Sequence, residues 1–165
     1  MSTINEELLN MSFSANVVTD FYAQLIPKLM NKYDDEQKVA EILKDFGRRL
    51  IKRFYDYWTP QSTEFKEILK ETYKMLMRKR LRIIDTVIEN KKWIVIDSNC
   101  ILCGSGGKSF GNIHYCILIG ALLENGINYL RVKEGFEHLP KIKAETISSK
   151  TNGDSACRHE IRVVE

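Results

Sequence analysis

The sequence predicts an α+β fold, with four main helices packed on a twisted antiparallel sheet of about four strands. Apolar residues recur at helical spacing from Ser14 to Leu76 and again after Ile113. Each of these regions is followed by a pair of short segments with the composition or alternation typical of β-strands. The chain has 165 residues, of which 44% are hydrophobic, and this is enough for one core. We therefore expect a single domain over residues 13–165, after an N-terminal extension over residues 1–12.

The first two predicted helices carry long apolar stripes. Ser14 can cap the first helix, and Pro27 inside it removes a backbone donor and should bend the axis. The second helix follows Asp35 and Glu36, whose charges favour the positive end of the helix dipole. Gly47 in its middle indicates either the close approach of another helix or simple tolerance of a glycine. The apolar positions are Val17, Val18, Phe21, Tyr22, Leu25, Ile26, Leu29 and Met30, then Val39, Ile42, Leu43, Phe46, Leu50, Ile51, Phe54, Tyr55 and Trp58.

A third helix and a hairpin are expected next. The helix should begin near Ser62, after the break at Thr59-Pro60. It ends in the basic run Arg78–Arg82, which suits either the negative end of a helix dipole or contact with anionic lipid. The β-branched segments Ile83–Ile88 and Trp93–Ile96 then predict a hairpin.

A glycine-rich loop precedes a fourth helix and a second hairpin. The helix is expected to begin at Ile113, to kink at Gly126 and to continue beyond it. Along Cys157–Val163, apolar residues alternate with charged ones, which predicts a strand with one face in the core. Its expected partner is Ile142–Ile147, and Asn152-Gly153 in the connection supplies the positive φ angles of a turn.

Charge and hydropathy exclude several classes of protein. The net charge is +3 with both signs mixed, unlike the strongly basic face of a nucleic-acid-binding protein, so we expect no nucleic-acid partner. The N-terminus contains Glu6 and Glu7 and lacks the basic and apolar regions of a signal peptide. No apolar run is long enough to span a bilayer. We expect a cytoplasmic protein with at most peripheral membrane contact.

Known catalytic motifs are not matched. Gly106–Ser109 lies between a predicted strand and a helix, like a phosphate-binding loop, but Leu102 occupies the position of the first glycine that this motif requires. No serine or cysteine has a recognisable nucleophile context. We therefore expect no enzymatic activity and assign no catalytic residue.

The four cysteines allow three interpretations. Cys100 and Cys103 form a C-x-x-C pair, which could bind zinc or act as a redox pair. The favoured interpretation is that the cysteines are buried and only fill the core. A four-ligand metal site would need further residues, and the candidates are Cys116, Cys157, His114 and His159.

The apolar stripes of the first two helices are wider than one small sheet can cover. They indicate either an ordinary core or a surface for a partner. If a partner binds there, the residues expected at the dimer interface are Val17, Phe21, Leu25, Phe46, Leu50 and Phe54.

Several segments, in order along the chain, resemble the TRAPP core-subunit family of vesicle-tethering proteins. Tyr33–Glu36, Leu43–Gly47 and Arg49–Phe54 look like the paired first helices of that family. Further similar segments are Phe65–Met75, Ile94–Leu102 and Ile113–Leu122. The segment Gly153–Ile161 resembles the closing hairpin of the related vinyl-reductase-type ligand-binding domains.

The resemblance implies a TRAPP-subunit-like fold that dimerises through its first two helices, with itself or with a homologous subunit. It also implies a scaffold role in vesicle tethering or in the assembly of a small-GTPase exchange factor, with no cofactor expected. The alternative is a vinyl-reductase-type sensor that binds a small apolar ligand or zinc. These remain two distinct hypotheses at the level of the sequence.

The chain departs from both relatives at positions that matter for chemistry. Ser62 stands where one branch of the tethering family has an acylated cysteine, which removes the thiol that acylation there requires. Ser148 or Ser149 replaces one zinc-binding cysteine of the vinyl-reductase type. A zinc site in this chain would need the C-x-x-C pair as a substitute. The resulting candidate zinc ligands are Cys100, Cys103, Glu145 and Cys157.

Overall fold

The computed structural model describes residues 20–77, 82–87, 92–104, 109 and 111–164. Some predictions concern other residues and lie outside the described part of the chain. They are the N-terminal extension, the cap at Ser14, the interface residue Val17, residues 78–81 of the basic run and most of the glycine-rich loop.

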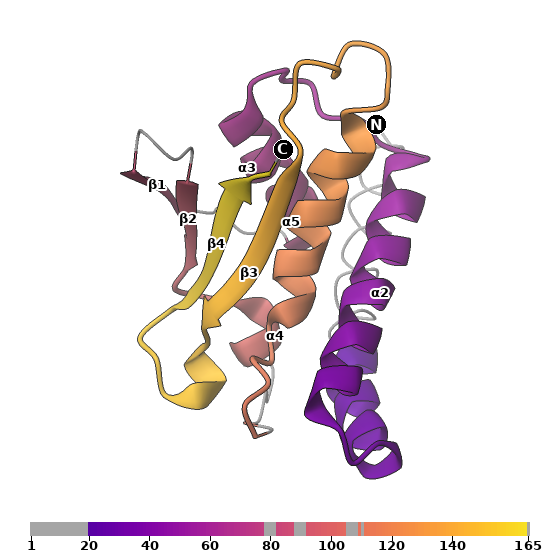
Figure 1. Ribbon diagram of the computed structural model, residues 1–165, viewed down its shortest axis with the longest axis vertical. Coiled ribbons are helices and arrows are strands. Elements are labelled where there is room, and N and C mark those ends of the chain that lie inside the picture. Colours follow the sequence, from indigo (N-terminus) through magenta and orange to yellow (C-terminus); the bar gives the residue numbers. More distant parts are fainter. Residues whose placement is uncertain (1–19, 78–81, 88–91, 105–108, 110, 165) are drawn as a thin grey trace, which may run out of the picture.

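A four-stranded antiparallel sheet with helices packed against it confirms the expected α+β fold (Figure 1). The strands, in the order β1-β2-β4-β3, are β1 (Arg82–Val87), β2 (Lys92–Asp97), β4 (Cys157–Val163) and β3 (Ile142–Ser148). The helices are the first helix (residues 20–32), α2 (Glu36–Tyr55), α3 (Phe65–Met77), α4 (Ile101–Gly104), α5 (Ile117–Leu130) and the short 3-10 helix η1 (Lys150–Asn152). Helix α5 lies against β3 and β4, and α2 packs on α5 (Figure 1).

Helices α2 and α5 approach each other closely because Gly47 has no side chain. The buried residues of α2 lie four positions apart and form one stripe: Val39, Leu43, Gly47, Ile51 and Tyr55. A Cβ atom at Gly47 would lie 3.0 Å from both Ala121 Cβ and Leu118 Cδ1 of α5. Of the two interpretations of this glycine, close approach is therefore confirmed.

The starts of α2 and α3 follow from local hydrogen bonds. Asp35 caps α2, because its carboxylate accepts a hydrogen bond from the Lys38 backbone N–H at 3.1 Å. Helix α3 begins at Phe65, later than the predicted start near Ser62. The Ser62 Oγ accepts a hydrogen bond from the Glu64 backbone N–H at 3.1 Å, which holds this segment in a turn before the helix.

Helix α5 begins at Ile117 rather than at Ile113. The segment before it is held by contact with the first helix, because the Tyr22 hydroxyl donates a hydrogen bond to the Tyr115 backbone carbonyl at 2.7 Å. The backbone here forms tight turns instead of a regular helix, because the N–H groups of Ile117 and Ile119 donate to the carbonyls of His114 and Cys116, three residues earlier, at 2.9 Å. Helix α5 runs through Gly126 to Leu130, so the expected continuation beyond this glycine is confirmed.

The β3–β4 hairpin confirms the predicted alternation. Buried and exposed residues alternate along β3, and the buried residues of β4 include Cys157, His159 and Ile161. Gly153 has the expected positive φ, at 93°. Asn152 instead ends η1, so the prediction that the Asn-Gly pair shares positive φ angles is wrong for this residue. The connection is longer than a two-residue turn because η1 lies within it.

Side chains of α5 close the outer edge of the sheet at β3. Asn128 bonds twice to the backbone of Ile142: its Oδ1 accepts from the N–H at 2.9 Å, and its Nδ2 donates to the carbonyl at 2.8 Å. The Glu124 carboxylate accepts from the Ala144 N–H at 2.7 Å. These are the backbone groups through which an exposed edge strand pairs with another chain. The edge is thus protected within the monomer.

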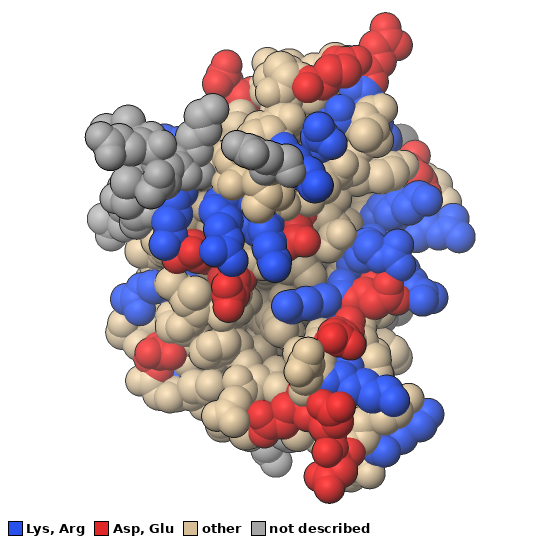
Figure 2. All heavy atoms as spheres, in the orientation of Figure 1, with Lys and Arg blue, Asp and Glu red and all other residues tan. Residues whose placement is uncertain are grey.

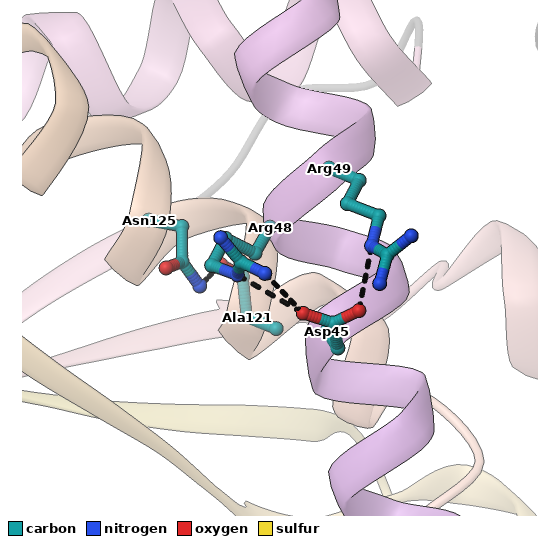
Figure 3. Close-up of polar contacts among 5 residues, drawn as sticks. All are labelled: Asp45, Arg48, Arg49, Ala121 and Asn125. Atoms are coloured by element: carbon teal, nitrogen blue, oxygen red, sulfur yellow. Dashed lines mark hydrogen bonds and ion pairs between the residues drawn. The ribbon is translucent and has the colours of Figure 1, made fainter.

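The solvent-facing side of α2 is charged. Figure 2 shows Lys and Arg side chains along this side of the molecule, and α2 contributes Arg48, Arg49, Lys52 and Arg53 to it. Asp45 accepts hydrogen bonds from Arg48 Nη2 at 2.5 Å and from Arg49 Nε at 2.7 Å (Figure 3). The hydrogen bonds from Arg48 lower the pKa of Asp45. Such exposed pairs contribute little to stability.

No described helix is long and apolar enough to cross a membrane.

Replacing Gly47 with Val tests the close contact between α2 and α5. The new side chain would overlap Leu118 and Ala121, so we expect the free energy of unfolding to fall by about 1–3 kcal/mol. Lys44→Val, which places the same side chain on the exposed face of the same helix, should change it by only about 0.5 kcal/mol. Urea unfolding of both variants makes the comparison, and equal stability would contradict the close contact.

Replacing Asn128 with Ala tests the protection of the β3 edge. The two backbone groups of Ile142 lose their partners, so we expect a loss of about 1–3 kcal/mol and an increased tendency to self-associate. The matched control is Asn125→Ala, because Asn125 Nδ2 donates only within α5, to the Ala121 carbonyl at 2.8 Å (Figure 3). Thermal unfolding and light scattering measure the two effects. If both variants behave alike, the strand edge does not depend on Asn128.

Candidate functional site

The four cysteines of the chain lie together where β2 ends and β4 begins. Cys100 immediately precedes α4 and Cys103 lies within it, while Cys116 immediately precedes α5 and Cys157 is the first residue of β4. Their four sulfur atoms all lie within 4.8 Å of one another. The fold therefore brings every cysteine of the sequence to one point from three separate segments.

The cysteine cluster is shielded from solvent and contains free thiols. Cys100 is 2% exposed, Cys116 and Cys157 are fully buried, and Cys103 is partly exposed. The sulfur atoms of Cys103 and Cys157 are 3.4 Å apart, well beyond the roughly 2 Å of a disulfide bond. The cluster is thus a compact set of four sulfur ligands with limited access to water.

The thiols influence one another because they hydrogen-bond within the cluster. The hydrogen bond from Cys100 lowers the pKa of Cys103, and hydrogen bonding within the cluster raises the pKa of Cys100 and of Cys116. The Lys150 backbone N–H lies 3.5 Å from the Cys157 sulfur and donates to it. This arrangement suits a thiolate surrounded by thiol donors.

The structure brings together three of the four candidate zinc ligands, Cys100, Cys103 and Cys157, but it does not bring Glu145 to them. The Glu145 side chain is 62% exposed, and its carboxylate lies 3.7 Å from Arg162 Nη2. Because side chains alternate across a strand, Glu145 points to the solvent-facing side of the sheet, whereas Cys157 lies on the buried face. Glu145 therefore cannot act as a ligand in this arrangement.

Cys116, and not a histidine, completes the group of four. His159 is buried, its Nδ1 lies 3.0 Å from Thr146 Oγ1, and burial lowers its pKa to about 4, which keeps the ring neutral. His114 Nδ1 lies 3.2 Å from Ser149 Oγ. His159 Nε2 is buried without a hydrogen-bond partner among the described residues, but the four ligand atoms that lie within 4.8 Å of one another are all cysteine sulfurs, so neither histidine belongs to the group. The sequence signal for Cys116 was its place at the start of the predicted fourth helix, close to the C-x-x-C pair.

The residues expected at a dimer interface form an apolar strip on the first helix and α2, apart from Val17, which is not described. The apolar strip consists of Phe21, Leu25, Phe46, Leu50 and Phe54. Phe21 is 50% exposed, and its ring centroid lies 5.8 Å from that of Phe46. The other members pack on the core but are only partly buried. The apolar strip therefore lies between core and solvent.

A cleft of about 430 Å³ separates α2 from the edge of β3, and residues of α5 also line it. Many of its lining side chains are polar or charged, among them Glu36, Lys44, Asn112, Glu124 and Thr146. An apolar ligand would remove these groups from water without giving them partners, which is unfavourable. The cleft is thus a poor match for the apolar ligand expected of a sensor domain.

Comparison with known proteins finds similarity of fold only. No protein-family model and no curated protein matches the sequence. Among solved structures, the chain is similar to a crystal structure of trafficking protein particle complex subunit 3 from Naegleria fowleri covalently bound to palmitic acid, with a TM-score of 0.72. The match covers 93% of this chain and 97% of that one, at 15% sequence identity. The expected TRAPP-subunit-like fold is therefore confirmed.

Replacing Tyr22 with Phe tests whether the first helix is held next to the cysteine cluster. The variant leaves the buried Tyr115 carbonyl without its donor, so we expect the free energy of unfolding to fall by about 1–3 kcal/mol. Tyr57→Phe is the control, because Tyr57 is 88% exposed and should change stability by about 0.5 kcal/mol or less. Denaturant unfolding measures both. Equal stability of the two variants would show that this hydrogen bond does not anchor the first helix.

Proposed function

We propose that this chain is a dimerising scaffold subunit of a TRAPP-like complex, which acts in vesicle tethering or in the assembly of a small-GTPase exchange factor. The observation that carries the proposal is the apolar strip on the first helix and α2, in a fold similar to that of a trafficking protein particle complex subunit. The proposed role is binding rather than catalysis, and its proposed setting is the cytoplasm, with at most peripheral membrane contact.

The composition of the apolar strip suits the centre of an interface. Phe46, Leu50 and Phe54 follow one another at intervals of one helical turn, beside the buried stripe of α2, so the apolar surface of this helix continues past the core. Phe21 and Leu25 extend it onto the first helix. Aromatic side chains are enriched at the centres of protein interfaces, and charged residues are depleted there. The charged face of α2 would then form the rim.

The partner we propose is a second copy of this chain or a homologous subunit. In a twofold dimer the same patch of both subunits meets, so an apolar strip finds a matching apolar strip without any charge pairing. A stable interface of standard size buries about 800 Å² on each partner. The apolar strip would therefore supply the anchoring residues, and neighbouring side chains of the two helices would supply the remaining area.

Lipid attachment by a thioester before α3 is not part of this proposal. The similar subunit is covalently bound to palmitic acid. In this chain Ser62 precedes α3, and all four cysteines lie in the cluster. Association would then depend on shape and apolar contact rather than on an attached lipid at this position.

The cysteine cluster favours a second candidate function, a vinyl-reductase-type sensor domain that holds zinc or a small apolar ligand. Native mass spectrometry separates the two candidates. A dimer without an organic ligand supports the scaffold, with or without metal, whereas a monomer that carries zinc, or a stoichiometric organic molecule in each chain, supports the sensor.

Replacing Phe21 with Asp tests the proposed interface. We expect the wild type to be a dimer at micromolar concentration, and the variant to raise the dissociation constant at least about tenfold, because a desolvated charge would meet an apolar partner. Ile147→Asp is the matched control: Ile147 is 44% exposed and lies on the solvent-facing side of β3, opposite the face that α5 covers, so the dimer should persist. Sedimentation equilibrium measures all three proteins.

Two results would contradict the proposal. One is a wild-type protein that is monomeric at micromolar concentration and recovers no homologous subunit on affinity purification. The other is a wild-type dimer that dissociates equally in both variants, or in neither, because the interface would then lie elsewhere.

A further inference from the structure

We infer that Cys100, Cys103, Cys116 and Cys157 form a four-thiolate zinc centre that ties α4 to the starts of α5 and β4. The inference does not depend on the scaffold role, because it rests on the arrangement of the four sulfur atoms. It also differs from the ligand set that the sequence predicts, since Cys116 takes the place of Glu145.

The spacing of the sulfur atoms matches tetrahedral coordination of zinc. Zinc binds thiolate sulfur at about 2.3 Å, and four such ligands in a tetrahedron lie about 3.8 Å from one another. In this structure the Cys103 and Cys157 sulfurs are 3.4 Å apart, and all four lie within 4.8 Å. Shifts of an ångström or less would bring every pair to the required separation. Rotation of the four cysteine side chains can produce shifts of this size.

The type and number of ligands indicate a structural site. A tetrahedral set of four sulfur ligands is typical of zinc or of iron–sulfur chemistry, and a structural zinc site is filled by four protein ligands. Here three of the ligands are at most 2% exposed, which leaves little room for a bound water or substrate. Zinc has no redox chemistry, so the centre would hold the fold and would not transfer electrons.

The surroundings of the cluster offset negative charge. Zinc with four thiolates carries a net charge of about −2, and binding releases the thiol protons to solvent. The Lys150 backbone N–H already donates to the Cys157 sulfur. Cys116 immediately precedes α5, whose 14 residues place the positive end of a helix dipole beside its thiolate. Hydrogen-bond donors and dipoles of this kind orient and stabilise metal ligands.

Zinc would add a link to a short helix that is held by Leu102 and Cys100 in the core. Helix α4 has four residues, and a helix of that length is not stable without tertiary contacts. Zinc would join this short helix to two segments that lie far from it in the sequence. The Tyr22–Tyr115 hydrogen bond next to Cys116 would extend the effect to the first helix. Loss of zinc should therefore loosen α4 and the first helix before the rest of the fold.

The metal content of the purified protein tests the inference directly. We expect one zinc per chain by plasma mass spectrometry after gel filtration in metal-free buffer. Cys116→Ser should bring zinc below one per chain, whereas the matched control Glu145→Gln should retain it fully, since Glu145 is exposed and remote from the cluster. Zinc retained by Cys116→Ser and lost by Glu145→Gln would overturn the assigned ligand set.

A second measurement uses the wild type alone, in case a cysteine variant fails to fold. X-ray absorption at the zinc edge should show four sulfur neighbours at about 2.3 Å. Replacement of zinc by cobalt should give the visible spectrum of tetrahedral thiolate coordination. Nitrogen or oxygen neighbours in place of sulfur, stoichiometric iron instead of zinc, or a metal-free protein whose cysteines are free or paired in disulfides would each overturn the inference.

Discussion

Helix α5 packs against α2 on one side and against the sheet on the other, and the rest of the structure depends on how closely it fits between them. Gly47 allows α2 to approach Ala121, and on the opposite side Gly120 allows the sheet to approach. A Cβ atom at Gly120 would lie 3.0 Å from Thr146 Oγ1 and 3.4 Å from His159 Nδ1. Small residues on both sides of α5 therefore set the spacing of all three layers. Close-packed interiors tolerate little change in such spacing.

The position of α5 determines which groups its side chains reach, both at its start and further along the helix. At its start, Cys116 reaches the cysteines of α4 and β4 only because the helix lies against the sheet. Further along, Glu124 and Asn128 reach the backbone of β3 for the same reason. One helix thus positions a candidate metal ligand and also protects the edge of the sheet. A shift of α5 would disturb both features together.

The sequence predicted the elements that depend on local pattern and missed the features that depend on how distant segments meet. The alternation along Cys157–Val163 and the helical stripes are periodic, so the strand and helices could be predicted. The failure of Glu145 to join the cysteines follows from strand register, in which Glu145 pairs with Glu160 and so shares its side of the sheet. That register depends on the connection between β3 and β4, and the helix η1 within this connection was not predicted from the sequence. The place of Cys116 depends on helix docking, which no local pattern reports.

The first helix connects the two candidate functional features. Its buried side carries Tyr22, which bonds to Tyr115 beside the cysteine cluster, and its outer side carries Phe21 and Leu25 of the apolar strip. A helix is a rigid element, so its contact with the core sets where its outer side chains lie. Zinc bound at the cluster would hold Cys116 and thereby the carbonyl that anchors Tyr22. The metal centre would then act on dimerisation without touching the partner, by keeping both helices of the apolar strip in one surface.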